Sequence, residues 1–202
     1  MFKQFNKESE KLRFETFVDA ILAIIMTILV LEFKVPEEPF DSDSSLLDHL
    51  SHLIPSVLSY VITFSTIVIL WLDHHNLFRM LKKADIPLVM LNFLFILFLS
   101  ATPFTTSLSG RNFHNPYAIA IMAANYLLMN ISFSAIWVYV QQKKLMDENI
   151  SAQFNNKFEN IIILIGILLQ IACIPLAFVN TAIPFMLFVV ILILHLIRLL
   201  RH

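Results

Sequence analysis

Six apolar runs, separated by short polar segments, are the feature that most constrains the fold of this chain. Each run approaches the roughly 20 residues that a helix needs to cross a bilayer. Hydrophobic residues make up 58% of the 202 residues and charged residues 14%, whereas ordinary globular domains have about 45–50% and 25%. A soluble domain could not bury so much apolar surface, so we predict an all-α membrane protein with a single domain over residues 1–202. The predicted spans are 16–35, 50–72, 86–108, 117–140, 161–179 and 183–198.

Several classes of function are disfavoured by what the sequence lacks. Its two glycines, Gly110 and Gly166, are too few for a P-loop, a dinucleotide fingerprint or a potassium filter of the TVGYG kind. The sequence has no HExxH or GxSxG motif, and the adjacent His74 and His75 point to different faces of a helix, which makes them a poor metal pair. The net charge of −1 gives no reason to expect nucleic acid. We therefore expect no enzyme, no cofactor and no nucleic-acid partner.

The distribution of lysine and arginine predicts how the spans are oriented. With the N-terminus inside, the cytoplasmic segments hold twelve of these residues and the outer segments only Lys34 and Arg111. Positive charge concentrates on the cytoplasmic side, so we expect a multi-pass protein of the cell membrane with both termini in the cytoplasm. The first outer loop, 32–48, carries six acidic residues. It either concentrates cations near a pore mouth or is only a solvated acidic turn.

The first predicted span carries an ionisable residue and, on another face, a narrow apolar stripe. Asp19 lies a few residues inside the cytoplasmic end, and an ionisable residue within a membrane is a functional hypothesis by default. At about 100° per residue, Asp19 points more than a quarter-turn away from the middle of the stripe, so we expect it to bond to neighbouring helices. The stripe consists of Ala20, Ile24, Thr27 and Leu31, flanked by Ile28.

Spacing alone leaves two interpretations of this stripe open. Apolar residues at intervals of four, three and four are typical of a helix that packs against another helix. The same pattern would line a pore if several copies of the helix surrounded an axis. Thr27 is equally ambiguous, because its hydroxyl can bond to a carbonyl one turn back and have no further role.

Polar residues at the same predicted depth are available as partners for Asp19 and Arg13. The second span is expected to end at its pair of histidines, with Trp71 one turn before His74, and Asn92 lies about two turns into the third span. A buried charge without partners is costly, so we expect a satisfied network among these residues. Alternatively, His74 is an interfacial histidine and Trp71 an ordinary residue of the aromatic belt.

Three motifs in the first three spans, taken together and in this order, resemble the endosomal/lysosomal potassium channel family (transmembrane protein 175). Residues 13–19 resemble its RxxxFSD signature, and residues 71–74 resemble its WxxH motif. An asparagine in the third span, followed eleven residues later by Pro-Phe, resembles its third-helix pattern. One departure is Val18, which stands where the signature has serine and so removes a hydroxyl from the network. The matching residues are Arg13, Phe17, Asp19, Trp71, His74 and Asn92.

The resemblance implies a fold of six transmembrane helices per subunit, assembled as a homotetramer with the first helix lining a central pore. It also implies that there is no carbonyl filter. The family's isoleucine constriction corresponds to Ile24, and the next pore-lining positions correspond to Thr27 or Ile28 and to Leu31. These residues belong to the stripe or flank it.

The function implied by the resemblance is a potassium-permeable channel for monovalent cations in a lipid bilayer, with potassium as the permeant ion. A narrow apolar ring excludes water, and potassium sheds its water more easily than sodium, so such a ring favours potassium without a binding cage. Two alternatives stay open. One is a proton-conducting pore with Asp19 and His74 as relay groups, and the other is a membrane scaffold that conducts nothing.

Overall fold

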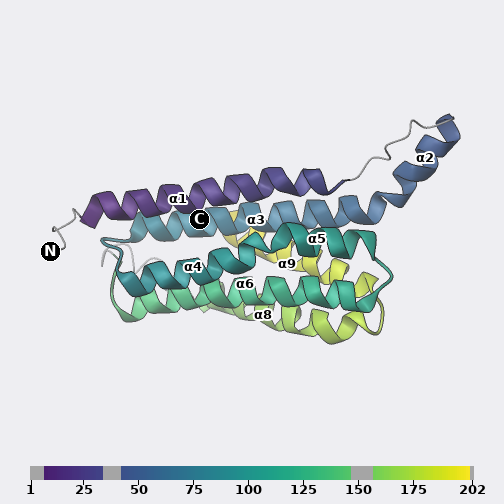
Figure 1. Cartoon of the computed structure of the whole chain (residues 1–202). Helices are drawn as coiled ribbons and strands as arrows, with labels where there is room; N and C mark the ends of the chain where they lie inside the picture. The colour runs from purple at the N-terminus through teal and green to yellow at the C-terminus, as the bar shows by residue number, and fades with distance from the viewer. Residues whose placement is uncertain (1–6, 34–41, 147–156, 201–202) are drawn as a thin grey trace.

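The computed structural model of the chain is a bundle of long helices (Figure 1). It describes residues 7–33, 42–146 and 157–200. The end of the first predicted span and residues 34–41 of the acidic loop lie outside the described residues. In chain order the elements are α1 (Lys7–Ile28), the 3-10 helix η1 (Leu29–Glu32), α2 (Asp43–His52), α3 (Ile54–Met80), α4 (Ile86–Ser100), α5 (Thr102–Arg111), α6 (Pro116–Gln142), α8 (Lys157–Ala177) and α9 (Ala182–Leu200).

Five of the six predicted spans correspond to helices that are long and apolar enough to cross a membrane. The remaining one, 161–179, corresponds to α8, whose apolar part Ile161–Ala177 is shorter. The protein is therefore an all-helical membrane protein with several membrane-length helices in the part of the chain that the structure describes. The five long segments are Lys11–Glu32, Ile54–Met80, Ile86–Arg111, Pro116–Gln142 and Ala182–Leu200.

The second span begins later than the predicted 50–72. It starts at Ile54, and the residues before it belong to the separate helix α2. Pro55 lies in the first turn of α3, where a missing N–H is harmless but where a preceding helix could not continue. At the other end of α2, Ser42 and Ser45 form a reciprocal capping box, which gives this short polar helix a defined start.

Helix α3 extends past the histidines at which the second span is expected to end, and it continues to Met80. The polar residues that suggested an end have partners on other helices. Asp73 accepts hydrogen bonds from the Arg198 guanidinium of α9, and His74 is hydrogen-bonded to Asn92 of α4. Since these groups are satisfied within the bundle, they do not require water and the helix need not end there.

Prolines lie near a helix break or a helix end in two other spans. The third span is divided at Ala101 into α4 and α5, two residues before Pro103. The Thr102 hydroxyl donates to the Leu99 carbonyl at this break, with an oxygen–oxygen distance of 2.7 Å. Pro175 lies inside α8, two residues before this helix ends at Ala177.

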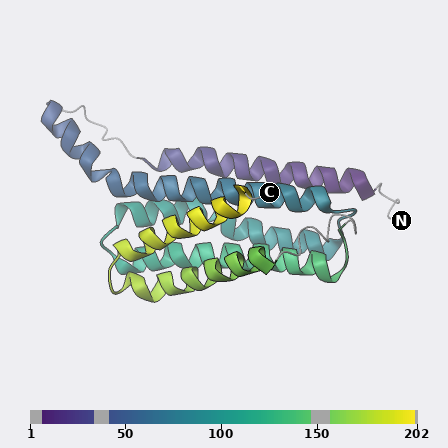
Figure 2. The ribbon, with the colours of Figure 1, turned by 180° about the vertical axis from the view of Figure 1, so that it is seen from behind.

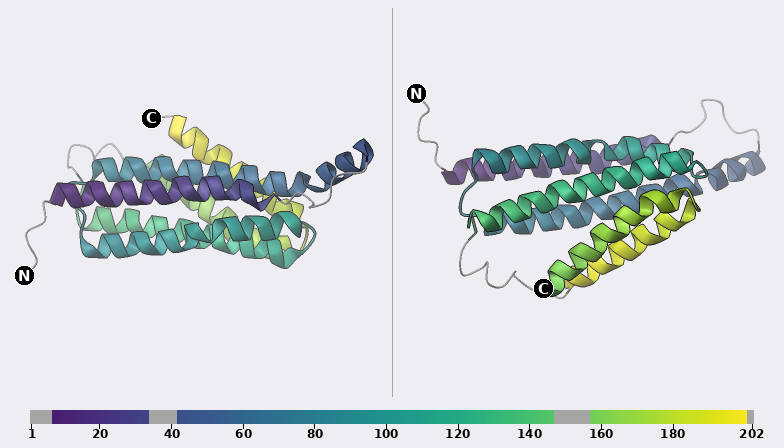
Figure 3. Two further views of the ribbon diagram at one scale, coloured as in Figure 1. Left: turned by 45° about the horizontal axis from the view of Figure 1, so that its top comes forward. Right: turned by 90° about the horizontal axis from the view of Figure 1, so that it is seen from below.

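Helix α6 lies in the middle of the bundle and contacts α4, α5 and α8. Seen from behind, α9 crosses α3 (Figure 2), and α8 and α9 lie side by side (Figure 3). The close contact of α3 and α5 depends on Gly110, since a Cβ at this position would lie 2.7 Å from the Ser56 Cα. Helix α1 lies along the outside of the bundle, against α3 and α4 (Figures 1 and 3).

Candidate functional site

Helix α1 has a buried face and an exposed face. The buried face packs against the bundle and includes Val18 and Leu22, both fully buried, with Ile25 further along and Leu29 in η1, which continues α1. These four residues have the same intervals of four, three and four as the stripe, and on a helical projection they lie nearly opposite it. Two faces with the same periodicity therefore have opposite environments.

The predicted pore-lining residues all lie on the exposed side of α1 and of η1, which continues it. Ile24 is 55% exposed and Leu31 67%. Thr27 and Ile28 are exposed as well, with Ile28 nearer the edge. Within one chain, packing against its own bundle does not explain the stripe, because the residues that pack are those of the other face.

The Thr27 hydroxyl donates to the backbone carbonyl of Ile24, with an oxygen–oxygen distance of 2.8 Å. This is a bond to a carbonyl one turn back, the alternative in which the hydroxyl has no further role. A hydroxyl has one hydrogen to donate and two lone pairs to accept with. The bond to Ile24 uses the hydrogen and leaves the oxygen able to face a cation, so the bonded geometry and a role toward ions are compatible.

A groove of about 760 Å³ runs beside the exposed stripe, between α1 and α5. Ile24 and Ile28 line it from α1, and Pro103 and Phe104 line it from α5. At one end of the groove, Arg111 donates to the backbone carbonyl of Glu32 across 3.0 Å. The groove thus extends the exposed apolar surface of α1 onto a second helix.

The signature residues form two hydrogen-bonded pairs. The Trp71 indole N–H donates to the Asp19 carboxylate across 3.0 Å, which joins α3 to α1. His74, fully buried, is hydrogen-bonded through Nε2 to the Asn92 side-chain oxygen across 3.0 Å. The Asn92 amide nitrogen in turn donates to the Leu88 carbonyl, so both ends of this amide have partners.

Aromatic packing surrounds these pairs. The His74 ring stacks on Phe78, with centroids 4.3 Å apart. Phe17 of the signature lies within 6.3 Å of Phe14 and within 6.1 Å of Phe93, measured between ring centroids. Apolar contacts of this kind hold the end of α1 against α3 and α4 around the Asp19–Trp71 bond.

Two signature positions differ from the expected network. The Arg13 side chain is exposed and forms no ion pair within the described part of the chain, so the structure does not bring it together with Asp19. Val18, at the serine position, is fully buried in the apolar core. A valine is well suited to that position, because a hydroxyl there would need a partner.

An ion pair that the sequence does not predict joins Asp73 of α3 to Arg198 of α9. Arg198 is one of the twelve lysines and arginines assigned to the cytoplasm, but the residue is only 8% exposed. Its position in an otherwise apolar last turn was the available signal, since a charged residue among membrane-buried ones usually has a partner. The partner could not be identified, because 125 residues separate the two in sequence.

The chain is similar in sequence to several known ion channels. A sequence profile described as "Endosomal/lysosomal potassium channel TMEM175" matches residues 13–103. A potassium channel of Streptomyces collinus is 32% identical over 149 residues, which is 71% of this chain and 71% of the relative. A potassium channel of Chamaesiphon minutus is 31% identical over 134 residues, 65% of this chain and 66% of the relative. The chicken endosomal/lysosomal proton channel TMEM175 is 34% identical, and the match covers 27% of its length.

The crystal structure of a lysosomal potassium-selective channel TMEM175 homolog from Chamaesiphon minutus matches the fold with a TM-score of 0.77. The match covers 94% of this chain and 98% of the other, at 26% identity. A second crystal structure, of a variant of the potassium channel MtTMEM175, matches with a TM-score of 0.57 at 18% identity, which supports the fold alone. The structural match therefore includes the last three predicted spans, in which none of the three sequence motifs lies.

Proposed function

This chain belongs to the family of the endosomal/lysosomal potassium channel TMEM175, and on that premise we propose that it forms a potassium-permeable cation channel lined by α1. The family is one of ion channels, not of enzymes. The main observation in favour of a pore-lining α1 is its exposed stripe, which lies opposite the face that packs against the bundle. We propose further that four copies of the chain assemble with their stripes facing a common axis.

Conduction in this proposal depends on an apolar constriction. Ile24 forms the narrowest ring, and Leu31 lines the pathway two turns further out. A narrow ring of apolar side chains loses its water and closes, whereas a wider one conducts ions that shed part of their hydration. Potassium gives up water at lower cost than sodium, so the ring favours potassium. Thr27, between the two, supplies oxygens that partly replace the lost water.

The signature network supports the pathway without lining it. The Asp19–Trp71 bond and the aromatic contacts of Phe17 hold α1 against its own bundle. The His74–Asn92 bond joins α3 to α4 behind that contact. In this proposal these residues set the position of α1, and hence the width of the ring at Ile24, through packing alone.

The proposed orientation has both termini in the cytoplasm of a multi-pass protein of the cell membrane. The supporting observation is the excess of lysine and arginine, twelve against two, in the segments assigned to the cytoplasm. In this orientation the groove end at Glu32 and Arg111 faces outward, and Asp19 and Trp71 lie toward the cytoplasmic side.

Flux measurements on sealed liposomes containing the purified chain test this function. A potassium gradient should drive potassium flux, and a sodium gradient of equal size should drive less. The proton alternative has the support that the animal relatives are named proton channels, and it would give pH change without potassium flux. If neither ion moves through liposomes that hold the assembled protein, the chain is a scaffold and the proposal is wrong.

A further inference from the structure

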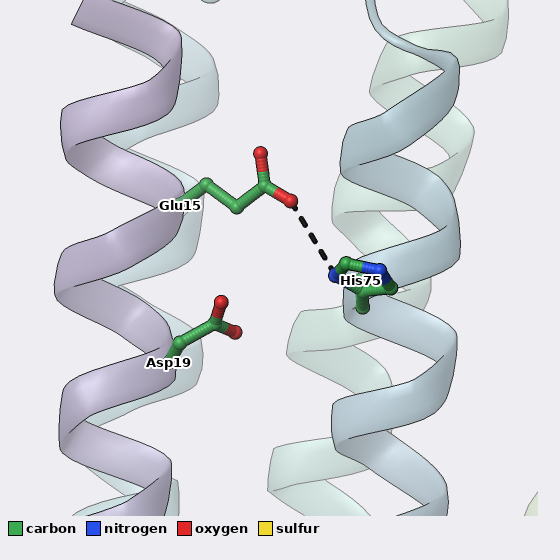
Figure 4. A group of neighbouring side chains, drawn as sticks. All are labelled: Glu15, Asp19 and His75. Carbon is green, nitrogen blue, oxygen red and sulfur yellow. Dashed lines mark ion pairs between the residues drawn. The ribbon is translucent and has the colours of Figure 1, made fainter.

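A cluster of three potential metal ligands joins α1 to α3, away from the exposed stripe. Glu15 and Asp19 lie one turn apart on α1, and His75 lies on α3 opposite them (Figure 4). One ligand atom from each residue lies within 4.8 Å of the other two. Among the described residues, this is the one group of three or more histidine, cysteine, aspartate or glutamate side chains whose ligand atoms lie this close together. We propose that it binds a divalent transition-metal ion of the zinc type.

The distances suit a zinc ion after small side-chain movements. His75 Nδ1 lies 3.5 Å from Glu15 Oε1, and two ligands of a tetrahedral zinc ion at about 2.0–2.2 Å from the metal are roughly 3.3–3.5 Å apart. The Asp19 carboxylate needs to approach by about an ångström, which a rotation of its side chain allows. Three protein ligands would leave the fourth position for water.

The three side chains are already oriented by their neighbours. The Trp71 N–H donates to Asp19 Oδ1, and the second carboxylate oxygen stays available. The Trp71 ring also stacks on the His75 ring at a centroid distance of 5.6 Å and an angle of 21°. Groups that hold a ligand in place in this way are a regular part of metal sites. Trp71 would thus orient two of the three ligands.

The lack of a hydrogen bond to His75 also favours a bound metal ion. Its Nδ1 atom is buried and has no hydrogen-bond partner, and Figure 4 shows it facing Glu15. A buried polar atom without a hydrogen bond is costly. In the described part of the chain, no lysine or arginine forms an ion pair with Glu15 or Asp19. The contact between His75 and Glu15 is an ion pair at 3.5 Å without a hydrogen bond, and a divalent cation between them would bond to Nδ1 and place positive charge beside the two carboxylates.

The donor set selects among metals. Magnesium and calcium prefer oxygen ligands alone, whereas an imidazole nitrogen beside two carboxylates suits zinc and related transition metals. A bound ion would also tie α1 to α3 at one end. Given the proposed function, in which α1 lines the pathway, zinc would restrain a pore-lining helix. The binding site itself does not depend on that function.

Titration calorimetry on the full chain, purified in detergent and freed of metal with a chelator, tests the site. We expect zinc chloride to bind at one ion per chain and to raise the unfolding temperature, and magnesium chloride to do neither. Glu15→Gln and His75→Gln should each weaken zinc binding by more than about tenfold. Their unfolding temperatures without metal show whether each variant is folded.

Two further variants separate loss of a ligand from loss of structure. Glu15→His replaces one zinc ligand by another and should retain zinc binding. His52→Gln is the matched control, because His52 is also paired with a carboxylate, Asp48, at 3.6 Å, but has no third ligand among the described residues. It should bind zinc as the parent does. Absence of zinc binding, equal binding by Glu15→Gln, or equal binding of magnesium would overturn the proposal. Liposome flux is measured separately, so failure of the site does not imply failure of the channel.

Discussion

Helices α1 and α6 are both long and apolar, yet α6 lies in the middle of the bundle and α1 lies along its outside. In the most apolar stretch of α6, 50% of the residues are buried, but in that of the segment Lys11–Glu32, which comprises most of α1 and η1, only 22% are buried. The stretch in Lys11–Glu32 nevertheless has the higher mean hydropathy. Hydropathy therefore indicates that a helix lies in the membrane, but it does not indicate how many protein neighbours that helix has.

The difference between the helices follows from the sizes and partners of their side chains. Helix α6 buries small residues, including Ala118, Ala123 and Ser132, which let other helices approach closely. Its Tyr126 hydroxyl is hydrogen-bonded to Thr63 of α3. Helix α1 instead has large aliphatic side chains on both faces, and only one face meets the bundle. Its other face is free for lipid or for a second copy.

The largest expected effect is the loss of Tyr126 at the centre of the bundle. Tyr126→Ala should leave a cavity next to α3 and α9 and lower the free energy of unfolding by about 3–5 kcal/mol. Leu128→Ala, on the exposed face of the same helix, should cost less than about 1 kcal/mol. Thermal unfolding in detergent measures both. Equal losses would show that α6 does not owe its stability to its central position.

The second effect concerns the exposed face of α1. Ile24→Asn places polar amides in the proposed dry ring, so the ring should become wet more easily and discriminate less between ions. Reversal potentials with potassium on one side and sodium on the other should shift toward zero, with larger sodium currents. Ile24→Leu, which keeps the ring apolar, is the control. Current and selectivity that stay at parental values in Ile24→Asn would remove Ile24 from the pathway.

The third effect concerns the contact between α1 and the bundle. Asp19→Asn removes the charge that accepts the Trp71 N–H and should cost about 1.5–3 kcal/mol, as for other hydrogen bonds to charged groups. We expect lower assembly yield and a lower unfolding temperature, with nearly unchanged ion preference in the surviving channels. Normal assembly combined with a large loss of potassium preference would instead place Asp19 in the pathway.

The smallest effect concerns a single oxygen. Thr27→Val keeps the shape of the side chain and removes the hydroxyl, which is bonded to the Ile24 carbonyl of the same chain. If its oxygen faces the ion, potassium preference should fall severalfold, equivalent to about 1 kcal/mol, with little change in assembly. Bi-ionic recordings measure the preference. Unchanged selectivity would mean that the hydroxyl serves the helix alone and that the apolar ring discriminates by itself.

The sequence was sufficient for the fold class and for the geometry of α1. The apolar runs predict helices because backbone groups in lipid must be satisfied within the segment. The offset of Asp19 from the stripe follows from helical periodicity, and the structure bonds Asp19 to Trp71 while leaving Ile24 exposed. Periodicity could not say which of two equivalent apolar faces would be buried. That choice depends on the neighbouring helices.

Only the tertiary structure decided which polar groups meet. The partners Asp73 and Arg198 are 125 residues apart, and no local pattern joins them. The same pairing explains why α3 continues past its histidines, where local polarity predicted an end. His75 comes to face Glu15 for the same reason, since their distance depends on how α1 packs against α3.

The sequence by itself determined which segments enter the membrane, because transfer of a segment into lipid depends on that segment's own residues. Contacts between segments depend on packing, which is a property of the whole bundle.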